Sequence, residues 1–230
     1  MTEAALIVGV GKGLGASLAR RLSREGMHVA LAARHPAKLD GLVRDTGARA
    51  YACDASQPAA VRQLFQRVKA DLGGPRLVVF NAGDRYRGPI ESLEAERVRQ
   101  CYEQTAFSGF LVAQCAARVM QEAGQGSLFF TGATASVKAL AQSVPFAMAK
   151  FALRALAQSL ARELAPQNIH VAHFVIDGSI GTARGSSADA GAADAELDPD
   201  AIAETCLHVH RQHRSAWTWE VELRPWVERF

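Results

Sequence analysis

Val8-Gly9-Val10-Gly11-Lys12-Gly13-Leu14-Gly15 follows an apolar run that begins at Ala4, and it opens a stretch of helical period that reaches Arg24. Strand, glycine loop and helix therefore occur in the order of a dinucleotide-binding unit. Glycines allow a tight turn and a close approach of the backbone to a pyrophosphate, which the amino end of the helix attracts. Gly9, Gly11, Lys12, Gly13, Leu14 and Gly15 are thus expected to bind a cofactor, although a purely structural glycine turn would show the same residues.

The rest of the chain alternates between short apolar runs and longer stretches of helical period. The apolar runs predict strands at Ala4–Val10, His28–Ala33, Arg49–Cys53, Leu77–Phe80, Ser127–Thr131, His170–Ile176 and Trp217–Leu223. The periodic stretches predict helices at Leu14–Arg24, Pro36–Arg44, Pro58–Leu72, Leu93–Glu122, Pro145–Ala165 and Pro199–His213. This alternation predicts a Rossmann-type doubly wound α/β fold, with a mostly parallel seven-stranded sheet and helices on both faces. No Pro/Gly/Ser linker divides the chain, so residues 1–230 are expected to form one domain.

Composition bounds the class of protein. Of 230 residues, 49% are hydrophobic and 21% are charged, which supplies a sizeable core and excludes a disordered chain. The net charge of +3 arises from interleaved basic and acidic residues, so no nucleic-acid-binding surface is predicted. The apolar run after Ala4 is too short for a membrane span. Four separated cysteines without a Cys-x-x-Cys pair predict buried thiols in a reducing compartment and no metal site. A cytoplasmic location without membrane or nucleic-acid partners is therefore expected.

The end of the second predicted strand carries the signal for the choice of cofactor. An NAD site places a carboxylate about 20 residues beyond the glycine loop, where it accepts hydrogen bonds from the ribose hydroxyls. Here Ala33 and Arg34 occupy that place, and the next acid is Asp40. The guanidinium of Arg34 and the ammonium of Lys12 suit a 2′-phosphate, although both residues would also serve as ordinary surface charges. NADP(H) is therefore expected in preference to NAD(H).

Further along, four motifs occur in order: Asp54-Ala55, Asn81-Ala82-Gly83, Lys150, and Asp177-Gly178-x-Ile180-x-Thr182. With the glycine loop they resemble the short-chain dehydrogenase/reductase family over nearly the whole chain. The resemblance implies an oxidoreductase in which Asp54 lies beside the adenine and Lys150 binds the nicotinamide ribose. Beyond the glycine loop and Arg34, the implied cofactor contacts are Asp54, Ala55, Asn81, Ala82, Gly83, Thr131, Lys150, Gly178, Ile180 and Thr182.

The chain departs from that family at its catalytic positions. Phe146 stands at the position of the catalytic tyrosine, four residues before Lys150, and Ala133 stands thirteen residues earlier, at the catalytic serine. The asparagine position is Thr105, and Asp177 replaces the proline of a Pro-Gly pair. Phenylalanine has no exchangeable proton, whereas general acid catalysis contributes about 10²–10⁴-fold to a rate. The family's carbonyl chemistry is therefore not expected to run here unchanged.

An altered proton path would use Lys150, Thr134, Asp177 or water. Thr134 would face the site only if a bulge turned it, because neighbouring strand side chains point to opposite faces. Asp177 would act only if burial raised its pKa. A packed threonine and a turn aspartate are the plainer interpretations. A run of small and polar residues at about 183–197 predicts a flexible lid over one end of the sheet.

Three functions remain open on the sequence. The first is an NADP(H)-dependent oxidoreductase that moves hydride to or from a small carbonyl or alcohol by a non-standard proton path. The second is a catalytically silent NADP(H)-binding sensor or subunit of an assembly, and the third is an interaction protein with a vestigial pocket. The family resemblance and the apolar surface of the predicted helix Leu93–Glu122 imply a homodimer or homotetramer.

Overall fold

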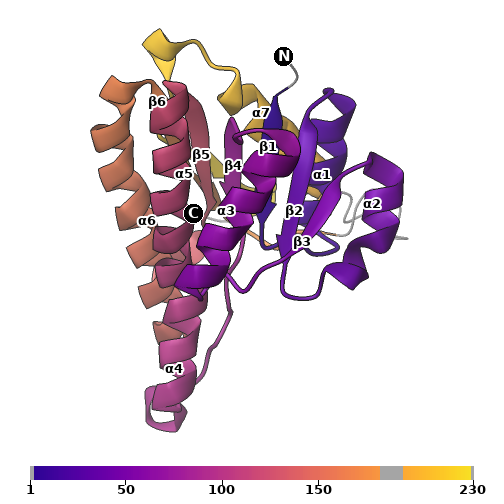
Figure 1. The fold of residues 1–230 in the computed structure, drawn as a ribbon. Helices are drawn as coiled ribbons and strands as arrows, with labels where there is room; N and C mark the ends of the chain where they lie inside the picture. Colours follow the sequence, from indigo (N-terminus) through magenta and orange to yellow (C-terminus); the bar gives the residue numbers. More distant parts are fainter. Residues whose placement is uncertain (1–2, 182–193, 229–230) are drawn as a thin grey trace.

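Seven parallel strands form one sheet in a computed structural model that describes residues 3–181 and 194–228 (Figure 1). The strands are β1 (Ala4–Val8), β2 (His28–Ala33), β3 (Arg49–Ala52), β4 (Leu77–Phe80), β5 (Gly126–Thr131), β6 (Ile169–Ile176) and β7 (Glu220–Leu223). Their order is β3-β2-β1-β4-β5-β6-β7, and every neighbouring pair is parallel. Because the order reverses between β1 and β4, the sheet has the switch point of a doubly wound fold, and the predicted Rossmann-type class is confirmed.

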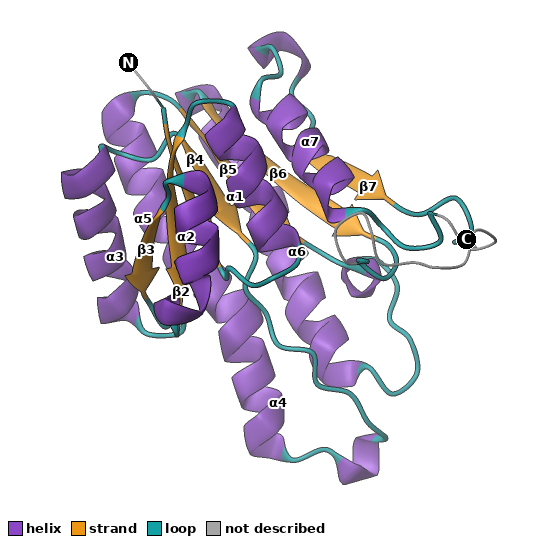
Figure 2. Ribbon diagram, turned by 90° about the vertical axis from the view of Figure 1, so that its right-hand side faces the viewer, coloured by secondary structure: helices purple, strands orange, loops and turns teal. Residues whose placement is uncertain are grey.

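Helices cover both faces of this sheet (Figures 1 and 2). They are α1 (Leu14–Arg24), α2 (Asp40–Thr46), α3 (Pro58–Leu72), α4 (Ala95–Tyr102), α5 (Ser108–Ala123), α6 (Val144–Leu164) and α7 (Pro199–His210). Along β1, Ala5 and Ile7 pack into the core under α1, α2 and α7, whereas Leu6 and Val8 pack under α3, α5 and α6. Alternate side chains therefore fill two cores, which explains why the strands read as continuous apolar runs.

The predicted helix Leu93–Glu122 corresponds to a continuous helical stretch, but it contains a π turn that the sequence did not predict. The structure begins α4 at Ala95, inserts a π-helical turn at Glu103–Phe107, and continues as α5. The hydroxyl of Ser108 donates to the carbonyl of Glu103 at 2.7 Å, five residues earlier, and so supports the wider turn. Such turns concentrate at functional sites, and this one lies where α4 projects beyond the carboxyl ends of the strands (Figure 1).

Several predicted element ends also differ from the structure. The first strand stops at Val8 because Gly9 adopts a φ of +90°. The last strand begins at Glu220 and not at Trp217, whose ring instead stacks on His170 with the centroids 4.7 Å apart. The segment after Pro36 is a 3₁₀ turn before α2, and α7 ends at His210. No helix in the described part of the chain is long and apolar enough to span a lipid bilayer.

Gly9 is one of the positions at which the fold leaves no room for a side chain. A Cβ there would lie 2.4 Å from the backbone nitrogen of Ala82, and its φ of +90° is unfavourable for alanine. We expect Gly9→Ala to lower the free energy of unfolding by at least about 2 kcal/mol, measured by urea denaturation. Gly11→Ala is the matched control, because a Cβ at Gly11 meets nothing within 4 Å. Equal stability of the two variants would contradict the described packing.

Candidate active site

Three hollows adjoin one another along the carboxyl ends of the strands. A central hollow of 260 Å³ is lined by residues that include Gly9, Arg34, Asp54 and Asn81. It shares Asn81, Ala82 and Gly83 with a hollow of 420 Å³ around Lys150, called here the lysine hollow. It shares Val10, Gly11, Ala33 and Arg34 with a hollow of 520 Å³ called here the basic hollow. The three hollows therefore lie next to one another across the switch point of the sheet, where ligands of doubly wound folds bind.

The central hollow is built where β1 and β4 end side by side. The side-chain amide of Asn81 donates to the carbonyl of Gly9 at 3.0 Å, and the backbone NH of Asn81 donates to Val8 at 2.8 Å. Asp54 lines the hollow, as does Ala55, and the Asp54 carboxylate accepts from the NH and the hydroxyl of Ser56 at 3.0 and 2.7 Å. The carboxylate is therefore held in place by its own turn.

Some residues of the glycine loop line the hollows, and others pack the loop against helix α1. Gly9, Gly11 and Lys12 line the hollows, and the space beside Gly11 is open. Gly13 precedes α1 and accepts from Ala16 at 2.9 Å, whereas Leu14 is buried. A Cβ at Gly15 would lie 3.0 Å from Val10 Cα, so Gly15 permits close packing of the helix on the loop. The residues 13–15 thus shape the loop without lining a hollow.

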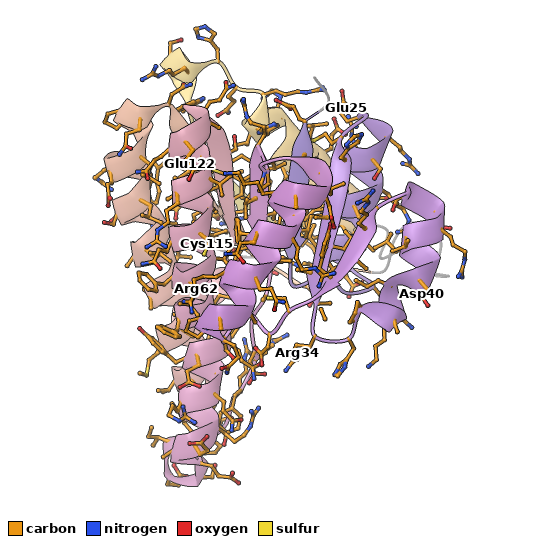
Figure 3. All side chains as sticks on the ribbon, in the orientation of Figure 1. Glu25, Arg34, Asp40, Arg62, Cys115 and Glu122 are labelled. Atoms are coloured by element: carbon orange, nitrogen blue, oxygen red, sulfur yellow. The ribbon has the colours of Figure 1, made fainter. Side chains whose placement is uncertain are left out.

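The basic hollow gathers positive charge beside the end of β2. The side chains that line it include Lys12, Arg20, Arg34, His35 and Lys38, and no carboxylate is among its described lining residues. Arg34 follows the carboxyl end of β2, at the same end of the sheet from which α4 projects (Figures 1 and 3). Ala33 fills the place at which a carboxylate would face a ribose, so the arrangement fits an anionic group such as a phosphate.

Lys150 is the buried charge of the lysine hollow. Its side chain comes from α6, and its ammonium donates to the carbonyl of Thr131 at 2.8 Å. Burial lowers the pKa of Lys150 to about 8, since desolvation disfavours the charged form. The thiol of Cys101 acts weakly in the opposite direction. Lys150 therefore carries a proton at neutral pH and releases it far more readily than a solvated lysine.

Phe146 and Ala133 also line the lysine hollow, so the two altered family positions do lie at the site. Three cationic groups surround the ring of Phe146: Lys150 Nζ at 6.0 Å from the centroid, and the guanidinium carbons of Arg85 and Arg87 at 6.0 and 5.6 Å. The lining side chains with exchangeable protons include Lys150 and Arg85, but no tyrosine among the described residues.

Gly132 fixes the turn that carries Ala133. A Cβ on Gly132 would lie 2.4 Å from Nε2 of His173, so the imidazole directly supports the end of β5. His173 Nδ1 lies 3.0 Å from Glu220, and Glu220 also accepts two hydrogen bonds from Arg154, at 2.6 and 2.7 Å. Burial lowers the pKa of His173 to about 4, so its ring is neutral at physiological pH.

The remaining proposed catalytic side chains do not line the lysine hollow. Thr105 is fully buried in the π turn, where its hydroxyl accepts from the NH of Asp84 at 3.1 Å. Thr134 begins a 3₁₀ turn, and Asp177 forms an ion pair with Arg224 at 3.4 Å. Neither Thr134 nor Asp177 is among the residues that form the wall.

The segment after β6 completes the lysine hollow. Thr131, Gly178 and Ile180 line it, and Gly178 has a φ of +144°. Thr182 and most of the predicted lid, residues 183–193, lie outside the described residues. The end of that run is described: Leu197 is buried and pairs with Ile180 in an isolated parallel bridge.

Sequence reasoning missed several lining side chains. Arg20, His35 and Lys38 join the basic hollow from α1 and the turn before α2. Arg85 joins the lysine hollow from the loop after β4. The signal for Arg85 was present in Asp84-Arg85-Tyr86-Arg87, since two arginines follow a predicted cofactor motif directly.

Comparison with known proteins adds an independent observation. The family model described as short chain dehydrogenase matches residues 3–191. A crystal structure of a short-chain dehydrogenase from Rhodopseudomonas palustris is 34% identical, with a TM-score of 0.84 over 97% of this chain and 99% of that chain. A metagenomic short-chain oxidoreductase in complex with NADP is 25% identical, with a TM-score of 0.84 over 97% of both chains.

Among curated proteins, a 3-oxoacyl-[acyl-carrier-protein] reductase of Mycobacterium avium is 28% identical over 182 residues, which is 79% of this chain and 69% of that protein. The family match spans the glycine loop, the Asn81 turn and Lys150, the same residues that form the three hollows. This chain therefore belongs to the short chain dehydrogenase family of oxidoreductases.

Proposed function

We propose that the protein binds NADP(H) along the three joined hollows and is an oxidoreductase for a small carbonyl compound or alcohol. The observation that carries the proposal is the row of three hollows with shared lining residues, which runs from the basic hollow past Gly9 and Asn81 to Lys150. The NADP complex of the metagenomic relative supports the class of cofactor. When bound, the cofactor supplies or accepts a hydride.

The basic hollow would select the phosphorylated cofactor. Arg34 offers a planar fork of donors for a 2′-phosphate, and Lys12 adds a point charge from the glycine loop. Asp54 would face the adenosine, and Lys150 would donate to the nicotinamide ribose. The open space at Gly11 leaves the backbone accessible to the pyrophosphate.

Lys150 would supply the proton that tyrosine supplies elsewhere in the family. A lysine with a pKa of about 8 is poised to donate near neutral pH, because catalytic acids work best when their pKa is close to the working pH. Its ammonium would pass a proton to the carbonyl oxygen directly or through one water. Thr134 and Asp177 take no part in this proposal, since neither lines the lysine hollow.

The alternative is an NADP(H)-binding protein without turnover, such as a sensor or a subunit of an assembly. Phe146 and Ala133 favour it, because together they remove one proton donor and one hydrogen-bond donor from the wall. Both functions share the cofactor site and differ only in chemistry at the lysine hollow. Measuring NADPH binding and NADPH oxidation on the same sample separates them.

A second copy of this chain is the proposed partner. Apolar side chains remain exposed on α4, the π turn, α5 and α6: Tyr102, Phe107, Phe110, Val144, Met148 and Phe151. The rings of Phe107 and Phe110 stack with centroids 6.1 Å apart, and α6 packs against α4, the π turn and α5. Together with the family resemblance, this surface supports a homodimer or homotetramer.

Cofactor preference tests the basic hollow. We expect NADPH to bind at least tenfold more tightly than NADH, about 1.4 kcal/mol, in a fluorescence titration. Arg34→Ala should bring the ratio of the two dissociation constants close to one, because the fork that meets the phosphate is lost. Arg62→Ala, which removes an exposed arginine on α3, is the matched control and should keep the wild-type ratio (Figure 3). A ratio of one in the wild-type protein would refute the assignment.

Restoring the family side chains tests the chemistry. We expect Phe146→Tyr with Ala133→Ser to raise NADPH-dependent reduction of small ketones at least tenfold, since general acid catalysis contributes about 10²–10⁴-fold. Adding Lys150→Met should remove the gain and weaken NADPH binding. Tight NADPH binding with no oxidation by either the wild type or the double variant would instead support the silent alternative.

Light scattering at micromolar concentration tests the assembly. We expect a dimer or tetramer, and we expect Met148→Glu with Phe151→Glu to shift it to the monomer, because each buried charge opposes association. Ala201→Glu, an exposed position on α7 on the other face of the sheet, should leave the mass unchanged. A wild-type monomer would show that the apolar face has another purpose.

A further inference from the structure

Two arginines lie beside Phe146, a wall residue of the lysine hollow, and neither has an acidic partner among the described residues. Arg85 and Arg87 come from the loop between β4 and α4, and no ion pair joins either guanidinium to a carboxylate in the described part of the chain. Their neighbour Arg97, in contrast, bonds to Asp84 at 3.1 Å. The described contact of Arg85 and Arg87 is the face of Phe146, with the guanidinium carbons 6.0 and 5.6 Å from the ring centroid.

The charge of the hollow is therefore unbalanced. Asp84 is the carboxylate among its described lining residues, and Arg97 already neutralises it. Lys150, Arg85 and Arg87 remain as three positive groups around one aromatic ring. A ring face attracts cations but carries no net charge, so it orders the guanidinium groups without neutralising them. Both arginines are exposed to solvent, so an anion that enters the hollow can reach them and balance part of this charge.

We propose that the lysine hollow takes a carbonyl or hydroxy compound that bears a carboxylate, with Arg85 and Arg87 as the groups that bind the carboxylate. The inference rests on the proposed function, because the same hollow would hold the reacting carbonyl near Lys150. Guanidinium groups bind carboxylates through paired hydrogen bonds of matching geometry, which an ester or a simple ketone cannot accept with the same strength.

Phe146 has a defined part in this arrangement. The centroid of its ring lies within 6.0 Å of the buried ammonium of Lys150 and of the guanidinium carbons of both arginines. Arg85 and Arg87 are exposed beside this ring, so a ligand that enters the hollow can reach them. Phe146, which stands at the family's catalytic tyrosine position, is thus a positioning residue for substrate recognition.

Acids paired with their own methyl esters test the proposal. The probes are 2-oxopentanoate, 3-oxopentanoate and 4-oxopentanoate with their esters, which share one carbon skeleton and place the carbonyl at different distances from the carboxylate. Calorimetry at 0.15 M salt measures binding to the free protein and to the protein saturated with NADP⁺, which cannot reduce the probes. We expect at least one acid to bind tenfold more tightly than its ester, about 1.4 kcal/mol.

Arg85→Gln with Arg87→Gln should abolish that difference, whereas Arg62→Gln on α3 should keep it. Arg85→Lys with Arg87→Lys keeps the charge but loses the fork, and should retain only part of the preference. Wild-type protein that binds every acid and its ester equally, or a double glutamine variant that still prefers the acid, overturns the inference. If NADPH itself fails to bind, the proposed function falls, and the preference measured on the free protein still decides the carboxylate site.

Discussion

The contact between the glycine loop after β1 and the Asn81 turn after β4 is the constraint on which the site depends. Gly9 sits so close to Ala82 that a Cβ would lie 2.4 Å from its backbone nitrogen, and Asn81 spans the same gap with a 3.0 Å hydrogen bond to Gly9. The two strand ends meet where the strand order reverses. This contact holds the central hollow open between the basic hollow and the lysine hollow, so all three belong to one surface.

The chemistry at Lys150 follows from what surrounds it. Its ammonium is buried against the carbonyl of Thr131, and desolvation brings its pKa to about 8. On one side, Phe146 contributes a ring and no proton. Behind the adjacent turn, His173 and Glu220 form a neutral imidazole and carboxylate pair that supports Gly132. The site thus combines a buried lysine with an aromatic ring and two exposed arginines beside that ring.

The sequence predicted the sheet because both faces of the strands are buried, so each strand appears as a short, continuous apolar run. Such a run can be recognised from neighbouring residues alone. The sequence indicated the glycine loop and Arg34 because they follow predicted strands directly, whereas Asn81 after β4 and Lys150 on α6 came from the family resemblance. It missed the π turn, since that depends on one hydroxyl of Ser108 reaching Glu103. It also missed Arg85 in the lysine hollow and Arg20 in the basic hollow, because each reaches its hollow only once the chain has folded. Thr134 begins a 3₁₀ turn, and Asp177 forms an ion pair with Arg224. Neither of these structural roles could be predicted from the periodicity of the sequence.

A crystal structure of the protein grown with excess NADPH tests the central claim most directly, namely that the three hollows form one cofactor site. The proposed site predicts continuous density along the three hollows. The 2′-phosphate should lie within hydrogen-bond distance of Arg34, and the nicotinamide ribose within reach of Lys150 Nζ. Density that occupies a different surface, or a cofactor whose 2′-phosphate points away from Arg34 and whose ribose does not contact Lys150, would contradict it.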